Sequence, residues 1–182
     1  MPEWDHKRSI MQRYDITAEM YDRRYSKEQT SKIEAVIQNA KMEDSLVLDL
    51  GCGTGFLFQY VANKAKATVA LDLSRRNLIQ AKERAKKFAN IHLVLGDADH
   101  LPLKTGIFSH LYAITLLQNM PEPIKTLEEA RRVVESGGLI AVTGLKKKFT
   151  QESFEGLIRC SGLNCMFIEN DLLNCWAAVY TV

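Results

Sequence analysis

Hydrophobic positions along the chain alternate between short apolar runs and stretches with one apolar face. The runs contain five to seven mainly apolar residues and lie at residues 45–50, 68–73, 91–95, 108–114 and 139–143. Between them, apolar residues recur at helical spacing from residue 56 to about 66, over 75–88 and over 124–135, where Gly137-Gly138 is expected to end the helix. Buried parallel strands are nearly continuous apolar runs, whereas a helix that covers a sheet needs one apolar face. The pattern therefore predicts an α/β fold.

The two ends of the chain add further elements. At the N-terminal end, Ile10, Tyr14, Ala18, Tyr21 and Tyr25 recur at helical spacing and predict a helix with an aromatic stripe over residues 1–30. Ser31 and Glu34 form a capping-box pattern that predicts the start of a second helix. At the other end, Thr150 is expected to cap a helix ending at Gly162, followed by strands at about 163–169 and 174–182.

Length and composition place the chain among single-domain globular proteins. It has 182 residues, of which 46% are hydrophobic and 25% charged, and its net charge of +2 is too small to indicate nucleic-acid binding. The sequence has no apolar run of roughly 20 residues and no N-terminal signal pattern, so we expect no membrane span and a cytoplasmic location. Its cysteines, Cys52, Cys160, Cys165 and Cys175, form no CxxC pair, so we expect reduced thiols and no metal site.

A glycine-rich turn carries the first chemical signal. The run Val-Leu-Asp-Leu-Gly-Cys-Gly-Thr-Gly at residues 47–55 predicts a strand, a tight turn and then a helix. Such a turn presents free backbone N–H groups at a helix N-terminus, where a carboxylate, a ribose or a phosphate binds. A P-loop would need a Gly-Lys-Ser/Thr ending, and the dinucleotide fingerprint would need a small residue where this chain has Phe56. A nicotinamide dehydrogenase is therefore a weaker alternative.

An acid near the end of the second predicted strand supports a nucleoside ligand. Asp72 follows the glycines by about 20 residues, the spacing at which a carboxylate accepts hydrogen bonds from ribose hydroxyls. The alternative role for Asp72 is the N-cap of the following helix, but Ser74 suits that N-cap position better.

With these features, residues 47–55 resemble the first motif of class I S-adenosylmethionine-dependent methyltransferases. The Gly-Asp-Ala and Leu-Pro pairs within residues 96–102 resemble a signature of the ubiquinone/menaquinone-type members. The resemblance implies one domain over residues 1–182, with a Rossmann-like, doubly wound sheet of seven strands. It also implies helices on both faces, an antiparallel C-terminal hairpin and S-adenosylmethionine as the cofactor.

The same resemblance implies which residues bind the cofactor. Asp97 is expected to bond the adenine amino group and the backbone of Ala98 to face the ring. The full set is Asp49, Gly51, Cys52, Gly53, Thr54, Gly55, Asp72, Leu73, Asp97, Ala98, Thr115, Tyr14 and Tyr21.

The segment at residues 14–22 resembles the lid of small methyltransferases, which covers the cofactor and substrate pocket. Residues 1–30 are thus expected to form a helical lid and residues 31–182 the cofactor-binding core. Aromatic rings suit a sulfonium, because a desolvated cation over a ring is stabilised by about 0.5–2 kcal/mol.

The chain departs from the family pattern near the expected substrate. Ser109 stands where an acid is common, and Gln118-Asn119 stand where a histidine is common. No catalytic residue is therefore assigned, and Tyr14, Gln118 and Asn119 are candidates for orienting the acceptor.

The methyl acceptor stays open at this point. Tyrosines together with Leu116, Leu117 and Met120 favour a small, partly apolar molecule. The basic helix at 75–87 and the three lysines at 146–148 fit the alternative of an RNA or protein acceptor, bound by this chain alone or with a partner subunit. A solvated surface explains these basic residues more simply. A non-catalytic cofactor-binding scaffold is the remaining alternative, and the sequence leaves the oligomeric state undetermined.

Overall fold

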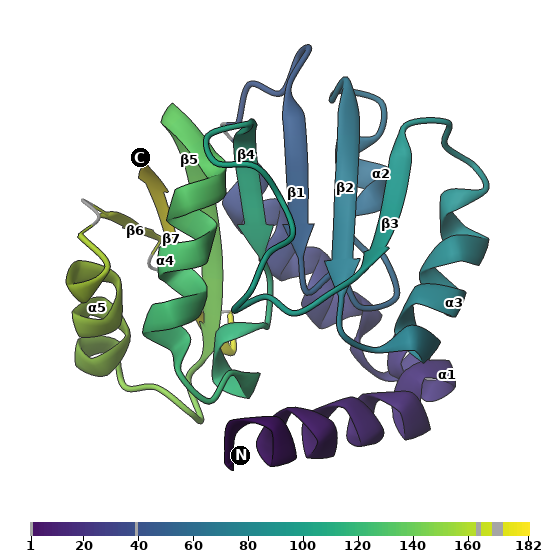
Figure 1. Ribbon diagram of the computed structural model, residues 1–182, viewed down its shortest axis with the longest axis horizontal. Coiled ribbons are helices and arrows are strands. Elements are labelled where there is room, and N and C mark those ends of the chain that lie inside the picture. The colour runs from purple at the N-terminus through teal and green to yellow at the C-terminus, as the bar shows by residue number, and fades with distance from the viewer. Residues whose placement is uncertain (1, 39, 163–164, 169–172) are drawn as a thin grey trace.

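A computed structural model describes residues 2–38, 40–162, 165–168 and 173–182, and the side chains of 17–24 and 165–168 are outside the description. Figure 1 shows one sheet with helices packed on it. The helices are α1 (Pro2–Ile37), α2 (Phe58–Val61), α3 (Arg75–Ala85), α4 (Pro123–Val133) and α5 (Gln151–Cys160), with a 3-10 turn, η1, at Leu117–Asn119. The strands are β1 (Leu46–Leu50), β2 (Ala67–Asp72), β3 (Ile91–Leu95), β4 (Phe108–Ala113), β5 (Val134–Leu145), β6 (Cys165–Ile168) and β7 (Cys175–Thr181).

The strand order explains where a ligand is expected to bind. The order across the sheet is β3-β2-β1-β4-β5-β7-β6. Strands β1 to β5 run parallel, whereas β7 pairs antiparallel with both β5 and β6. The winding reverses between β1 and β4, and open α/β sheets bind ligands at such a point, beyond the carboxyl ends of the strands. The Rossmann-like α/β class and the antiparallel last two strands are thus confirmed.

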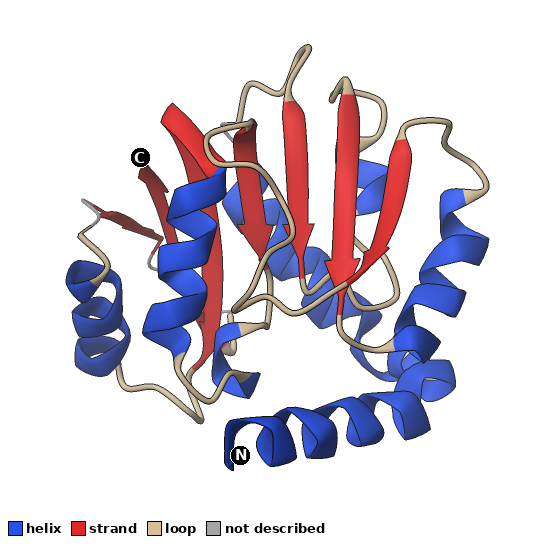
Figure 2. Ribbon diagram, viewed as in Figure 1, coloured by secondary structure: helices blue, strands red, loops and turns tan. Residues whose placement is uncertain are grey.

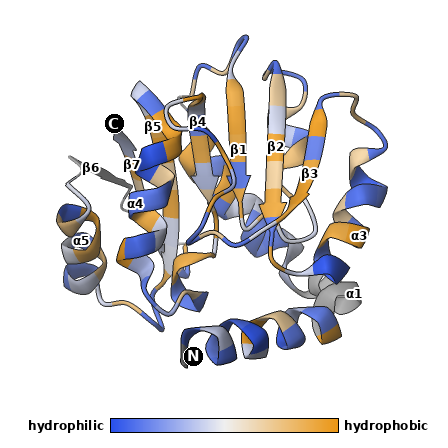
Figure 3. Cartoon of the chain, in the orientation of Figure 1, coloured by the Kyte–Doolittle hydropathy of each residue, from blue (hydrophilic) through white to orange (hydrophobic). Residues whose placement is uncertain are grey.

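Alternating side chains on the strands fill a core on each face of the sheet. Leu48 and Leu50 of β1 belong to the cluster that also holds Leu127 of α4 and Phe154 of α5. These two helices lie against the sheet at the left of Figure 2. Val47 belongs to the opposite cluster, which holds Ile33 and Val36 of α1. The strands are apolar along most of their length in Figure 3, as expected for a sheet covered on both faces.

The N-terminal helix is longer than the sequence predicts. Helix α1 continues from Pro2 to Ile37, so the predicted helix start at Ser31 is wrong. The hydroxyl of Ser31 donates to the carbonyl of Lys27 at 3.1 Å, a bond typical of serine inside a helix. The expected lid boundary after residue 30 therefore lies within a helix. The N-terminal part of α1 crosses beneath the carboxyl ends of the strands, and its C-terminal part packs behind the sheet (Figure 1).

Two further boundaries differ from the prediction. Helix α2 is only four residues long, and the chain returns to β2 through turns. Strand β5 begins at Val134, directly after α4, and includes Gly137-Gly138, so these glycines do not cap the helix. The pairing of β4 with β5 shifts register at this point, and a side chain on Gly138 would lie 2.6 Å from Val134. The predicted caps at Ser74 and Thr150 are both confirmed by side-chain hydrogen bonds to the backbone.

Candidate functional site

A cavity lies at the carboxyl edge of the sheet, between the strand ends and the N-terminal half of α1. Strand ends, the glycine turn and α1 all contribute to its wall. The lining residues are Lys7, Ile10, Met11, Tyr14, Gln29, Ile33, Asp49, Gly51, Cys52, Gly53, Thr54, Phe56, Leu57, Leu71, Asp72, Leu73, Ser74, Asn77, Gly96, Asp97, Ala98, Ile114, Thr115, Leu116, Asn119 and Met120. The acidic side chains at the strand ends thus lie across the cavity from mainly apolar side chains of α1.

The three glycines of the turn meet different requirements. Gly51 has φ +72°, and a Cβ there would lie 2.8 Å from the Leu116 side chain. Gly53 has φ +55° with open space on that side, so its backbone is accessible from the cavity. Gly55 does not line the cavity, and a Cβ there would lie 2.4 Å from the buried ring of Phe58. Gly55 is thus required by packing, whereas Gly51 and Gly53 border the ligand space.

Asp72 holds the glycine turn in place. Its carboxylate accepts hydrogen bonds from the backbone N–H of Gly53 at 2.8 Å and of Ser74 at 2.7 Å. The amide of Asn77 also donates to it, at 3.4 Å. Burial raises the pKa of the Asp72 carboxyl, and these hydrogen bonds only partly offset that effect. The carboxylate therefore positions the turn and also lines the cavity.

Asp49 is buried at the end of β1 with one oxygen unpartnered. Its Oδ2 accepts no hydrogen bond within the part of the chain that the structure describes, although Asp49 is only 3% exposed. Burial, with a contribution from the negative charge of Asp72, raises the pKa of Asp49 to about 8. An orphaned carboxyl facing a cavity is the partner that a ligand ammonium group requires.

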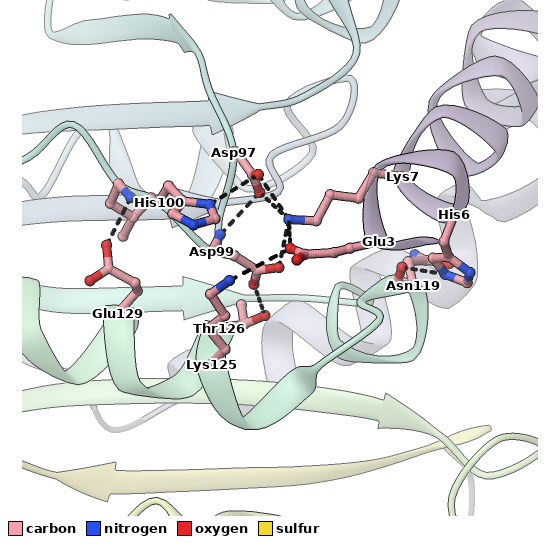
Figure 4. Close-up of polar contacts among 11 residues, drawn as sticks. Glu3, His6, Lys7, Asp97, Asp99, His100, Asn119, Lys125, Thr126 and Glu129 are labelled. Carbon is pink, nitrogen blue, oxygen red and sulfur yellow. Dashed lines mark hydrogen bonds and ion pairs between the residues drawn. The ribbon is translucent and has the colours of Figure 1, made fainter. Parts of the chain in front are cut away.

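A lysine from α1 enters the acidic loop after β3. The Nζ of Lys7 lies 2.8 Å from Oδ2 of Asp97, 2.7 Å from Asp99 and 2.9 Å from Glu3 (Figure 4). Burial lowers the pKa of the Lys7 ammonium, but the hydrogen bonds to the three acids outweigh it and hold that pKa above its ordinary value. Burial acts to raise the pKa of Asp97, but the hydrogen bonds from Lys7 and from the backbone N–H of Asp99 outweigh burial and lower that pKa. Asp97 thus borders the cavity with its carboxylate bonded to Lys7.

Thr115 follows β4 in a strained conformation. It has φ +63°, which is rare for a β-branched residue, and such strain often occurs at functional sites. Its N–H donates to the hydroxyl of Thr143 at 2.8 Å, and its own hydroxyl accepts from Lys32 and Gln29 at 3.3 Å each. These contacts tie the strand end to α1.

Asn119 connects η1 to α1, whereas Gln118 bonds to the backbone of Thr115, just after β4. The Asn119 amide donates to the Tyr14 hydroxyl at 2.9 Å, and its carbonyl oxygen accepts from Arg13 at 2.9 Å. Gln118 donates to the carbonyl of Thr115, and its Oε1 accepts no hydrogen bond from the described residues. Burial raises the pKa of Tyr14, so its hydroxyl stays protonated.

A second cavity adjoins the first toward the end of β5. It shares Ile10, Tyr14, Gln29, Thr115 and Asn119 with the first cavity. Its other lining residues are mainly polar or charged: His6, Ser9, Arg13, Tyr25, Glu28, Lys32, Gln118, Leu145, Lys146, Lys147, Lys148 and Asn174. Of the three apolar residues expected beside the acceptor, Leu116 and Met120 line the first cavity, whereas Leu117 is fully buried and lines neither.

The structure gathers most of the predicted cofactor-binding residues at the first cavity. Gly55 lies outside its lining, Gln118 borders only the second cavity, and the side chain of Tyr21 lies outside the described residues. The sequence interpretation missed Lys7, Met11, Gln29 and Asn77. Lys7, Ile10, Met11 and Tyr14 are spaced at i, i+3, i+4 and i+7, so extending the aromatic stripe back by one turn to Lys7 and widening it to Met11 would have found two of them.

Comparison with known families and proteins agrees with this geometry. A family model described as "Methyltransferase domain" matches residues 48–142. A malonyl-[acyl-carrier protein] O-methyltransferase from Marinomonas sp. is 30% identical over 145 residues, which cover 78% of this chain and 53% of the relative. A demethylmenaquinone methyltransferase from Staphylococcus haemolyticus is 37% identical over 100 residues, covering 53% of this chain and 41% of the relative. The chain thus spans about half the length of these curated relatives.

Solved structures share the fold. A SAM-dependent methyltransferase from Aquifex aeolicus superposes with a TM-score of 0.79 at 18% identity, covering 92% of this chain and 98% of that one. A putative methyltransferase in complex with the Trm112 activator from Haloferax volcanii gives a TM-score of 0.77 at 15% identity, covering 92% and 96%. Since the family model covers more than half of the sequence, the chain belongs to the S-adenosylmethionine-dependent methyltransferase family.

Proposed function

We propose that this protein transfers a methyl group from S-adenosylmethionine, bound in the first cavity, to an acceptor bound in the second. The observation that carries the proposal is the order of groups along the sheet edge. Asp97 follows β3, Asp72 ends β2, Asp49 and Gly51 lie at the end of β1, and Thr115 follows β4. The strands are neighbours in this order, so the groups form a row that leads to the second cavity.

The row of acids matches the parts of the cofactor. Asp97 and Ala98 lie at the end where the adenine is expected, and Asp72 lies where the ribose hydroxyls need an acceptor. The unpartnered oxygen of Asp49 suits the amino group of the methionine part. The backbone of Gly51 and Gly53 leaves the adjoining space open.

The contribution of the protein to transfer is alignment and exclusion of water. When bound, the cofactor supplies a methyl group on a cationic sulfur, and transfer to an acceptor lone pair leaves the broken bond's electron pair on that sulfur. Tyr14 and Thr115 border both cavities and are placed to orient the two ligands. Gln118 offers an unpartnered oxygen to a donor group of the acceptor.

A small-molecule acceptor is our preferred class. The relatives' names identify malonyl-[acyl-carrier protein] and demethylmenaquinone as their acceptors, and the second cavity is enclosed partly by α1. We also propose that the N-terminal part of α1 acts as a lid, because Lys7, Ile10, Met11 and Tyr14 cover the first cavity. Hydrogen exchange over residues 3–16 should therefore slow when S-adenosylhomocysteine binds.

Two measurements test the proposed function. Calorimetry should show binding of S-adenosylmethionine and S-adenosylhomocysteine in preference to NAD, ATP and GTP. Labelled methyl groups should then pass from the cofactor to the small-molecule fraction of a cell extract. Binding of NAD without S-adenosylmethionine would refute the proposal. Label found only in RNA or protein would show that the acceptor is a macromolecule. Cofactor binding without methyl transfer to any fraction would favour a non-catalytic scaffold.

A further inference from the structure

The second cavity carries a concentration of positive charge from two separate parts of the chain. Helix α1 contributes Arg13 and Lys32, and the segment at the end of β5 contributes Lys146, Lys147 and Lys148. Among the lining residues that the structure describes, the single carboxylate belongs to Glu28. The lining is therefore strongly cationic, although the net charge of the whole chain is only +2.

The carboxylate of Glu28 is already engaged. Its Oε1 lies 2.5 Å from Nζ of Lys32, a lysine that is fully buried. The same ammonium donates to the Thr115 hydroxyl at 3.3 Å. Glu28 and Lys32 neutralise each other, so among the described lining residues no carboxylate remains to balance Lys146, Lys147 and Lys148.

One of the three lysines is held at the rim by an aromatic ring. The Nζ of Lys146 lies 4.8 Å from the centre of the Trp176 ring, within the range of a cation–π contact. The indole N–H of Trp176 in turn donates to the carbonyl of Phe149 at 2.8 Å. Lys147 and Lys148 are exposed beside it, with no acid within ion-pair distance among residues that the structure describes. A concave surface with charge of one sign attracts a ligand of opposite sign.

We propose that the methyl acceptor carries an anionic group, a carboxylate or a phosphate, which binds at Lys146, Lys147 and Lys148 while the reacting atom points toward Thr115. This inference rests on the proposed function, because Thr115 lines both cavities, where that proposal puts cofactor and acceptor. The inference replaces the expectation of a partly apolar acceptor, because Leu116 and Met120, on which that expectation rested, line the first cavity. A small anion is favoured over RNA because the cations converge on one cavity, whereas Lys86 and Lys87 follow α3, which packs on β3 at the far edge of the sheet.

Binding of simple anions tests the inference without knowledge of the acceptor. The chain contains two tryptophans, so a Trp4→Phe variant leaves Trp176, beside Lys146, as the only fluorescent indole. The protein is saturated with S-adenosylhomocysteine and titrated with glutarate, inorganic phosphate and the uncharged glutaramide. We expect saturable fluorescence changes with one or both anions and none with glutaramide. The stronger of the two anions identifies the acceptor's group as a carboxylate or a phosphate.

Matched double variants locate the anion site. Lys147→Gln with Lys148→Gln should weaken anion binding by at least about fivefold, since each lysine contributes a modest electrostatic share. Lys86→Gln with Lys87→Gln removes the same charge at the other edge of the sheet and should leave anion binding unchanged. Neither pair should alter the affinity for S-adenosylhomocysteine.

Several outcomes would overturn the inference. They are the absence of saturable anion binding, equal binding of glutaramide, or equal loss in both double variants. Transfer of labelled methyl groups mainly to a neutral, cationic or RNA fraction of an extract separated by charge beforehand would also overturn it. A protein that fails to bind S-adenosylhomocysteine in the first step would instead refute the proposed function, so the two failures are distinct.

Discussion

The ammonium of Lys7 lies 3.0 Å and 2.8 Å from the two carboxylate oxygens of Asp97, although 90 residues separate them in the sequence. This contact fastens the first turns of α1 to the loop after β3, at the expected adenine end of the cavity. Lys7 is 3% exposed, so the ion pair is largely shielded from water. Removing one partner of a shielded ion pair is costly, because the other charge stays buried without a counter-charge.

Lys7→Met is therefore expected to release the N-terminal part of α1. The loss should be about 2 kcal/mol or more of local stability, seen as faster hydrogen exchange over residues 3–14, with faster dissociation of S-adenosylhomocysteine. Arg8→Met is the matched control, because Arg8 is exposed on the same helix. Unchanged exchange in the Lys7 variant would show that the ion pair does not hold the lid.

Asp49 is expected to lose a proton when the cofactor binds. Its pKa of about 8 leaves the free carboxyl mostly protonated at about pH 7. An ammonium group beside it favours the ionised form, so binding should release a proton. Calorimetric binding enthalpies should then differ between HEPES and Tris buffers, which have different ionisation enthalpies, and Asp49→Asn should remove the difference and weaken binding. Equal enthalpies for the wild type in both buffers would contradict this assignment.

The same carboxyl should affect stability in the absence of ligand. The pKa of Asp49 is raised from 3.8 to about 8 in the folded protein, so within this window the folded state holds a proton that the unfolded state loses. Its contribution to the free energy of unfolding therefore falls as pH rises from about 4 to 8. Asp49→Asn should remove this decline and stabilise the free protein by about 1–3 kcal/mol at the upper end of the window. Urea unfolding at several pH values measures the effect, and parallel pH profiles for variant and wild type would exclude it.

Asp72 is expected to matter for both the turn and the cofactor. Asp72→Ala removes an acceptor for the N–H groups of Gly53 and Ser74 and, under the proposed function, for the ribose of the cofactor. We expect S-adenosylmethionine binding to weaken by about 1.5–3 kcal/mol, or roughly ten- to hundredfold. Glu43→Ala, at an exposed site outside the cavity lining, provides the control. Calorimetric affinities that agree between the Asp72 variant and the wild type would rule out the ribose role.

Substitutions of Gln118 and Asn119 should distinguish a role in orienting the acceptor from a role in holding α1 over the cofactor. Gln118→Ala removes the unpartnered oxygen at the second cavity, so methyl transfer should slow by about tenfold while S-adenosylhomocysteine affinity stays the same. Asn119→Ala removes the bonds to Tyr14 and Arg13 and should weaken S-adenosylhomocysteine binding instead. Matching effects of the two substitutions on both measurements would argue against separate roles.

The parts of this fold that sequence predicts well are those encoded by local pattern. The strand runs and the position of Asp72 follow from hydrophobic periodicity and spacing, and the caps at Ser74 and Thr150 follow from short-range hydrogen bonds. The false capping box at Ser31 shows the limit of such signals. A serine hydroxyl that caps a helix in one context bonds the carbonyl four residues back in another.

What the sequence concealed depends on distant contacts. Lys7 resembles any surface lysine until the fold brings Asp97 and Asp99 to it. The orphaned oxygen of Asp49 and the strain at Thr115 likewise exist only once the strands are paired. The charge of the second cavity is visible in part as the lysine run at 146–148, but only the fold brings Arg13 and Lys32 of α1 to that run.

Helix α1 contributes to the walls of both cavities, through Ile10, Tyr14 and Gln29. This shared wall has a kinetic consequence for the proposed reaction. The acceptor compartment is complete only when the helix is seated over the cofactor, so we expect an ordered sequence in which S-adenosylmethionine enters first and S-adenosylhomocysteine leaves last. Product inhibition by S-adenosylhomocysteine should accordingly be competitive with the cofactor and noncompetitive with the acceptor.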